Sequence, residues 1–208
     1  MARIDLKNVA HSYAPNAKEP EYALKKCDIS WDDGGRYAVL GPSGCGKSTM
    51  LNIMSGLVKP SQGAISFDSL DVTHVKTSDR NIAQVFQFPV IYSTMTVAEN
   101  LGFPLLCRNF PKNDIDRKVK QVAETLGLND FLHFRAKSLT ADQKQLISLG
   151  RGLVRENVAA ILMDEPLTVI DPDLKFRLRR RLKEINELYR STLIYVTHDQ
   201  NEAMTFAE

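Results

Sequence analysis

The stretch with the clearest chemistry is a glycine-rich loop at residues 41–49 with the sequence GPSGCGKST. Glycines lack a Cβ, so the backbone N–H groups of such a loop can converge on a phosphate group. The spacing is that of a P-loop, in which the lysine reaches the β- and γ-phosphates and the next hydroxyl binds Mg²⁺. We therefore expect a nucleoside triphosphate site formed by Gly41, Pro42, Ser43, Gly44, Cys45, Gly46, Lys47, Ser48 and Thr49.

The elements beside this loop are the ones that a phosphate site requires. Residues 37–40 are mostly apolar and predict a short buried strand, and residues 50–54 continue as a helix. A strand, a glycine loop and a helix in this order place the helix N-terminus, with its unpaired N–H groups, at the phosphates. The alternative, a bare glycine-rich turn, does not need this context.

A second candidate element for the phosphate site is the apolar run at residues 161–163, which ends in Asp164 and Glu165. A continuous apolar run is typical of a parallel strand that is covered on both faces. At its carboxyl end, Asp164 can hold Mg²⁺, usually through water, and Glu165 can orient or deprotonate an attacking water. The alternative is a surface turn with two solvated acids.

The rest of the chain alternates strand and helix patterns. We expect an edge strand at 4–9, further strands at 22–29, 64–67, 82–86, 159–163 and 193–196, and helices at 114–126, 173–189 and from Gln200. The stretch from 97 to about 155 has a helical pattern throughout. The prediction is an α/β fold, a P-loop NTPase core at 1–96 and 156–208 with a helical subdomain inserted at about 97–155 and an N-terminal antiparallel β region.

The composition is that of an ordinary globular protein. The 208 residues are 43% hydrophobic and 25% charged, with a net charge of +2 and three cysteines in no pattern. A disulfide framework is therefore not expected. No apolar run approaches the length of a membrane span, and the N-terminus lacks the apolar core of a signal peptide. We expect a cytosolic chain, or one held at a membrane by another protein.

These motifs, in this order, resemble the nucleotide-binding subunit of ABC transporters, above all of importers for sugars, glycerol and glycerol phosphate. The resemblance runs from about Ile4 to Glu208. It implies ATP and Mg²⁺ as ligands, with Tyr13 stacked on adenine, Lys47 on phosphate, and Ser48, Gln87 and Asp164 at the metal. It also implies that Glu165 is the catalytic carboxylate, that Gln87 touches the attacking water, and that His198 contacts the γ-phosphate. The alternative for Tyr13 is an ordinary strand aromatic.

The resemblance also implies partners and a location. It predicts a single ABC ATPase cassette on the cytoplasmic face of the inner membrane, peripheral, with a second ATPase subunit and integral membrane permease subunits as partners. A solute-binding protein acts indirectly, and no nucleic acid is expected. Residues 88–92 and 101–105 would dock a permease helix, or else pack the helical subdomain. Importers of this type usually continue into a regulatory domain, which we expect to be absent.

The chain departs from the family pattern at the signature motif, where Leu-Ser-Gly-Gly-Gln is usual. Here the motif residues are Thr140, Ala141, Asp142 and Gln143, so a negative charge is offered to the partner's ATP. The alternative is that Asp142 points away and the backbone N–H groups still bind the phosphate. In the segment that follows Glu165, Val169 stands where an amide side chain is typical, while Asp171 is retained. We therefore expect an asymmetric pair with a different ATPase chain, against the alternative of a homodimer that tolerates the variant.

Two other functions stay open from the sequence, and the transported solute cannot be read from it. One is a regulatory ABC subunit that hydrolyses ATP poorly, and the other is an ABC ATPase that acts on nucleic acid without transport. The basic run at 177–183 bears on the second, but Glu184 and Glu187 follow it on the same helix. We expect this run to be a solvated helix face.

Overall fold

The computed structural model describes residues 2–155, 157–168, 170–189 and 192–207, without the side chains of residues 173, 181, 185 and 187–189. The chain divides into two compact units. The first unit comprises Met1–Gln84, Asn157–Asp164 and Asn186–Glu208, and the second comprises Val85–Glu156 and Glu165–Ile185. The domain boundaries expected from the sequence stay a prediction.

The first unit contains an antiparallel sheet with the strand order β2-β1-β4-β5. The strands are β1 (Ile4–His11), β2 (Leu24–Trp31), β4 (Gln62–Phe67) and β5 (Leu70–Asp71). The expectation of an edge strand at 4–9 is wrong, because β1 pairs with β2 on one side and with β4 on the other. Alternation of apolar residues reports one buried face, and it does not report which backbone edges are paired.

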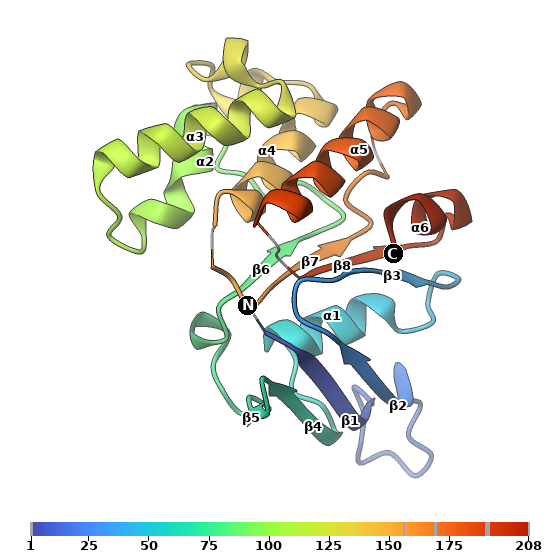
Figure 1. Ribbon diagram of the computed structural model, residues 1–208. Coiled ribbons are helices and arrows are strands. Elements are labelled where there is room, and N and C mark those ends of the chain that lie inside the picture. The colour runs from blue at the N-terminus through green and yellow to red at the C-terminus, as the bar shows by residue number, and fades with distance from the viewer. Residues whose placement is uncertain (1, 156, 169, 190–191, 208) are drawn as a thin grey trace. The chain divides into compact units, whose positions relative to one another are not determined.

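The second sheet of this unit has the order β3-β8-β7-β6. Its strands are β3 (Arg36–Leu40), β6 (Ile82–Val85), β7 (Ala160–Asp164) and β8 (Leu193–Thr197), and β8 runs parallel to both β3 and β7. Leu40 lies opposite Thr197, and Asp164 lies opposite Val196. The carboxyl ends of β3, β7 and β8 therefore lie at one edge of the sheet (Figure 1).

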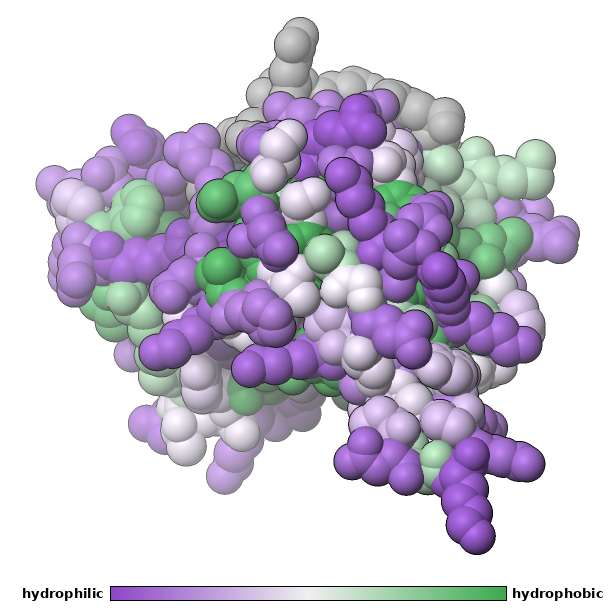
Figure 2. Space-filling model, turned by 90° about the horizontal axis from the view of Figure 1, so that it is seen from below, coloured by the Kyte–Doolittle hydropathy of each residue, from purple (hydrophilic) through white to green (hydrophobic). Residues whose placement is uncertain are grey.

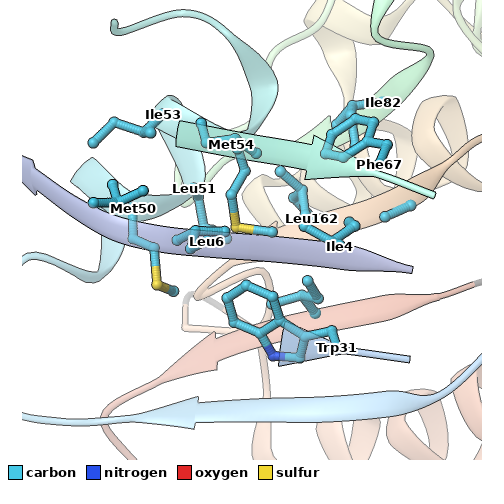
Figure 3. Close-up of a cluster of buried hydrophobic side chains, with 14 of the residues drawn as sticks. Ile4, Leu6, Trp31, Met50, Leu51, Ile53, Met54, Phe67, Ile82 and Leu162 are labelled. Carbon is cyan, nitrogen blue, oxygen red and sulfur yellow. The ribbon is translucent and has the colours of Figure 1, made fainter. Parts of the chain in front are cut away.

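The helix after β3 is held between the two sheets. Helix α1 (Lys47–Ser55) buries Met50, Leu51, Ile53 and Met54 in one core cluster. This cluster includes Leu6 of the antiparallel sheet and Leu162 of the parallel sheet, and Figure 3 shows these side chains around α1. The unit also contains the helices η1 (Thr77–Asp79) and α6 (Gln200–Phe206), and α6 packs on β3 and β8.

The second unit is helical. It consists of α2 (Val97–Leu106), α3 (Lys112–Leu126), η2 (Asn129–Phe131), η3 (Ala136–Ser138), α4 (Ala141–Leu153) and α5 (Pro172–Tyr189) as far as Ile185. Helices α2, α3 and α4 pack against one another (Figure 1). Gly150 permits this packing, because a Cβ there would lie 2.5 Å from Leu101.

Within the part of the chain that the structure describes, no helix combines the length and the apolar character that a membrane span needs. The face shown in Figure 2 carries mostly hydrophilic side chains, and hydrophobic ones lie between them in small groups. Such scattered apolar residues are normal for a protein surface.

Candidate functional site

The glycine-rich segment 41–49 follows β3 directly, and its residues 47–49 begin α1. Gly46 is the N-cap of α1 with φ 97°, and Gly44 has φ 80°. A Cβ at Gly46 would collide with the carbonyl oxygen of Ala23, so both the backbone angle and the space require glycine. The loop thus lies close to the backbone at Ala23. The N-terminus of α1 supplies unpaired N–H donors where the loop meets the helix.

Lys47 is buried, and its ammonium group lies inside the loop. Lys47 Nζ donates to the carbonyl oxygens of Gly41 at 2.7 Å and Pro42 at 2.8 Å, and Cys45 Sγ lies 3.9 Å away. These contacts hold a positive charge beside the positive end of the α1 dipole. The arrangement suits an anion, and Ser48 exposes its hydroxyl in the first turn of the helix.

An exposed aromatic ring lies beside this loop. Tyr13 is 66% exposed, and its hydroxyl is 3.4 Å from Thr49 Oγ1 in α1. The ring meets the buried ring of His11 edge-on, with 4.6 Å between the ring centroids. This contact fixes one edge of the tyrosine, and a flat aromatic ligand could stack on its exposed ring.

The carboxyl edge of the parallel sheet carries the other predicted groups of the first unit. Asp164 is the last residue of β7, and His198 follows the last residue of β8 and is exposed. Oxygen ligands suit Mg²⁺, which usually takes one or two protein oxygens together with phosphate and water. The hydroxyl of Ser48 and the carboxylate of Asp164 are of this type.

In the second unit, Gln87 and Glu165 meet across 78 residues of sequence, with Gln87 Nε2 3.4 Å from Glu165 Oε2. Thr168 Oγ1 also lies 3.3 Å from Glu165 Oε2 and donates to the Glu165 carbonyl oxygen at 3.0 Å. Glu165 itself has φ 44°, the left-handed region that only glycine adopts freely. A non-glycine residue in this region costs about 1–3 kcal/mol, and such residues cluster at functional sites.

Gln145 holds the two segments around this pair, and the sequence did not single it out for a role. Gln145 Nε2 donates to the carbonyl oxygens of Phe86 at 3.3 Å and Pro166 at 2.8 Å. Each of these is adjacent in the chain to one member of the Gln87–Glu165 pair. A signal was available, because Gln145 is a polar residue on the buried face of α4.

The signature segment forms the start of α4. Thr140 is the N-cap, its Oγ1 accepts from the Gln143 N–H at 3.3 Å, and Gln143 Oε1 accepts from the Thr140 N–H at 3.0 Å. Both polar side chains are therefore used in a capping box. Asp142 is partly exposed in the first turn, where it stabilises the helix dipole and opposes the approach of an anion. Val169 of the following segment lies outside the described residues.

The two apolar stretches proposed for docking differ in exposure. In the first, Phe88 is 71% exposed, and Val90 and Tyr92 are also exposed. In the second, Leu101 and Leu105 are buried, so they pack the helices of the second unit, as the alternative predicted. Of these two stretches, the one at 88–92 therefore presents exposed apolar side chains to a partner.

The basic run on α5 is partly exposed to solvent. Arg177 and Arg180 are exposed, and Arg180 Nε lies 3.5 Å from Glu184 Oε1 one turn later. The side chains of Arg181 and Glu187 lie outside the described residues. An exposed i,i+4 pair of this kind contributes only a few tenths of a kcal/mol, about 0.3–0.5.

Comparison with known proteins places this geometry in context. A sequence model of the family described as "ABC transporter" matches residues 24–168. The sn-glycerol-3-phosphate import ATP-binding protein UgpC 1 of Rhizobium etli is 39% identical over 208 residues, 100% of this chain and 58% of that protein. The trehalose/maltose import ATP-binding protein MalK of Thermococcus litoralis is 42% identical over 192 residues, 89% of this chain and 51% of that protein. The chain thus spans little more than half the length of these curated relatives.

Solved structures agree with the fold. The dimeric ATP-binding cassette MJ0796, in a post-hydrolysis state bound to ADP and Pi, is similar with a TM-score of 0.87 and 29% identity. The match covers 97% of this chain and 90% of that one. A nucleotide-free ATP-binding cassette from an ABC transporter, 24% identical with a TM-score of 0.83, shares the fold. The predicted fold class, an α/β cassette of the ABC ATPase type, is confirmed.

Proposed function

Because the chain belongs to the ABC transporter family, we propose that it is the ATP-binding and ATP-hydrolysing subunit of an importer for a small polar solute. The named relatives are import proteins for sn-glycerol 3-phosphate and for trehalose and maltose, which supports a sugar or glycerol phosphate type of solute. The observation that carries the proposal is the glycine loop, with Lys47 held by the loop carbonyls at the N-terminus of α1.

The phosphates and the adenine would be bound by residues of the first unit. The loop N–H groups and Lys47 would hold the β- and γ-phosphates, and the exposed ring of Tyr13 would stack on adenine. Mg²⁺, which neutralises phosphate charge when it is bound, fits the oxygen ligands of Ser48 and Asp164, with Gln87 as the further ligand that the family pattern implies.

Hydrolysis would need a group that orients or deprotonates water, and Glu165 is that group in this proposal. Its carboxylate already has two polar neighbours, the Gln87 amide and the Thr168 hydroxyl. His198, exposed after β8, would contact the γ-phosphate and stabilise the charge that develops on it. Thr49 and the remaining loop residues would form the backbone that surrounds the phosphates.

A titration with a fluorescent ATP analogue, together with phosphate release, tests this proposal. Wild-type protein should bind the analogue and, in complex with its partner ATPase subunit, release phosphate. Lys47→Ala should weaken binding by at least about tenfold, since a charged hydrogen bond contributes about 1.5–3 kcal/mol. Glu165→Gln should keep binding and lose at least about 99% of turnover, as expected for a group that acts on the attacking water. Wild-type protein that ignores Mg-ATP in the titration would refute the proposal.

The partner in this proposal is a second, different ATPase subunit with an ordinary signature motif. The groups for the chain's own ATP are present, whereas Asp142 adds a negative charge in the first turn of α4. A like charge close to a polyphosphate costs kilocalories where water is excluded. The ATP site on this chain's loop would hydrolyse, and the opposite site would be weak.

The signature segment offers a direct experiment. Asp142→Gly, with Ala141→Gly in the same chain, should increase ATP-dependent self-association of this chain, because it removes the opposing charge from the start of α4. Thr140→Ser, which keeps the hydroxyl, is the matched control and should change nothing. If the wild-type chain alone dimerises with ATP and hydrolyses it at a rate no lower than that double variant, the asymmetric pair is wrong.

A second candidate function is a regulatory subunit that binds ATP and hydrolyses it poorly. This function is supported by Asp142, whose negative charge opposes an approaching phosphate. It is opposed by the Gln87–Glu165 pair, because Glu165 is a carboxylate that can act on the attacking water. In the main proposal the chain is peripheral at the cytoplasmic face of the inner membrane, with permease subunits docked at the exposed stretch 88–92. A Phe88→Ser variant should then lose co-purification with membranes from its native cell while it still binds ATP.

A further inference from the structure

The exposed residue His198 lies in a very short connection of the first unit. It stands between Thr197, the last residue of β8, and Asp199, the N-cap of α6. The backbone position of His198 therefore depends on how firmly these two neighbours are held.

Thr197 is held on both sides by hydrogen bonds. Its Oγ1 donates to Glu202 Oε2 at 2.9 Å and accepts from the Asp199 N–H at 3.0 Å. The hydroxyl of Tyr195 donates to the same Glu202 oxygen at 3.0 Å. Glu202 Oε2 thus accepts hydrogen bonds from two residues of β8, Tyr195 and Thr197. Thr197 in turn accepts a hydrogen bond from Asp199, the residue after His198.

The hydrogen-bond network of Tyr195, Thr197 and Glu202 continues to the N-cap of α6, and most of it is buried. Asp199 Oδ1 accepts from the N–H groups of Asn201 at 2.7 Å and Glu202 at 3.3 Å. Glu202 is 5% exposed and Thr197 1%, and the ring of Tyr195 packs on Phe206. Every hydrogen bond named here joins groups of the segment 195–202, which carries His198.

A purely structural role would not need this network. A buried carboxylate is costly to desolvate, and a well-packed apolar residue of similar volume is often neutral or stabilising in its place. A satisfied buried network has a different effect, because it permits one backbone arrangement and rigidifies it. In this segment the arrangement that it fixes is the turn at His198.

We propose that Glu202 is a positioning residue that fixes the turn of His198, and that it acts through Thr197. The inference rests on the proposed role of His198 at the γ-phosphate. A shift of about 1 Å in a reacting group can reduce a rate by about a hundredfold, so a loosened turn should lower turnover more than ATP binding.

Three variants of α6 test this inference. Glu202→Leu keeps the approximate volume and removes the acceptor, Glu202→Gln keeps a side-chain oxygen, and Met204→Ala, at a residue 81% exposed on the same helix, is the matched control. The measurements are phosphate release against Mg-ATP concentration in the presence of the partner ATPase subunit, and the ¹H–¹³C signal of the His198 ring, assigned by its loss in His198→Ala.

We expect Glu202→Leu to lower kcat by at least about tenfold, to change KM by less than about threefold, and to shift the His198 signal. Glu202→Gln and Met204→Ala should stay close to the wild type. If Glu202→Leu does not fold, Thr197→Val removes the same link and takes its place, with Thr197→Ser as the control that keeps the hydroxyl.

The outcomes separate this inference from the proposed function. An unchanged His198 signal and kcat in Glu202→Leu overturn the inference, and so does an equal loss in Glu202→Leu and Met204→Ala. If His198→Ala hydrolyses ATP at the wild-type rate, the proposed role of His198 fails. In that case the His198 signal alone decides whether Glu202 positions the turn, by its shift or its constancy.

Discussion

Arg80 holds the carboxyl end of the helix that begins at the phosphate loop, and its replacement by methionine gives a sharp prediction. The residue is 3% exposed, and its guanidinium donates to four carbonyl oxygens. Two belong to the last turn of α1, Ile53 at 2.8 Å and Met54 at 3.1 Å. The others are Thr73 at 2.9 Å and Val75 at 3.0 Å. Arg80→Met keeps the apolar stem and removes all four hydrogen bonds.

The magnitude follows from these contacts. Each carbonyl that loses a buried partner costs about 1–3 kcal/mol, and four would suggest about 4–12 kcal/mol. The Ile53 carbonyl keeps the Gly56 N–H at 3.2 Å, which lowers the sum. Removal of a buried guanidinium also recovers several kcal/mol of desolvation. We expect a net loss of about 3 kcal/mol, or about 6–12 °C in the unfolding midpoint for a chain of this size.

The assay is thermal unfolding followed by circular dichroism, with two companion variants. Arg3→Met removes an exposed arginine that bonds Asp5 and Asp32, and it should cost less than about 1 kcal/mol. Arg80→Lys keeps the positive charge without the planar guanidinium. It should still lose most of the stability that Arg80→Met loses, because an ammonium group cannot reach all four oxygens. An Arg80→Met midpoint within about 2 °C of the wild type would refute the reasoning.

Three further predictions concern the loop, a helix cap and a buried amide. Gly46→Ala should weaken binding of the ATP analogue by at least about tenfold, whereas Gly44→Ala, with open space around its Cβ position, should cost only about 1–2 kcal/mol of backbone strain. The Thr96 N–H holds the pKa of Glu99 below its ordinary value, so this cap stabilises the fold at neutral pH and is lost as the pH falls through the folded-state pKa. In Glu99→Gln the urea midpoint of unfolding should therefore depend less on pH between about pH 6 and pH 3. The same pH dependence as in the wild type would contradict this. Asn100→Leu removes a buried amide that bonds both the N–H and the carbonyl of Tyr92, so limited proteolysis should cut residues 88–96 faster than in the wild type, with equal rates as the refuting result.

The sequence by itself determined the features that depend on neighbours along the chain. The strand, glycine loop and helix at 36–55 were predictable, because their spacing and the conformational freedom of Gly46 are local properties. The buried strand that ends at Asp164 was predictable for the same reason, from its continuous apolar run. The capping box at Thr140 involves a residue only three positions away, so its two members stood in the sequence as well.

Only the tertiary structure decided the features that join distant segments. Alternation in β1 could not show that both of its edges are paired, since the pairing depends on where β2 and β4 fold back. The contact of Gln87 with Glu165, 78 residues apart, and the four carbonyls gathered around Arg80 likewise follow from long-range packing. Local propensity and capping act over one helical turn, whereas burial and hydrogen-bond partners across a fold are set by the whole chain at once.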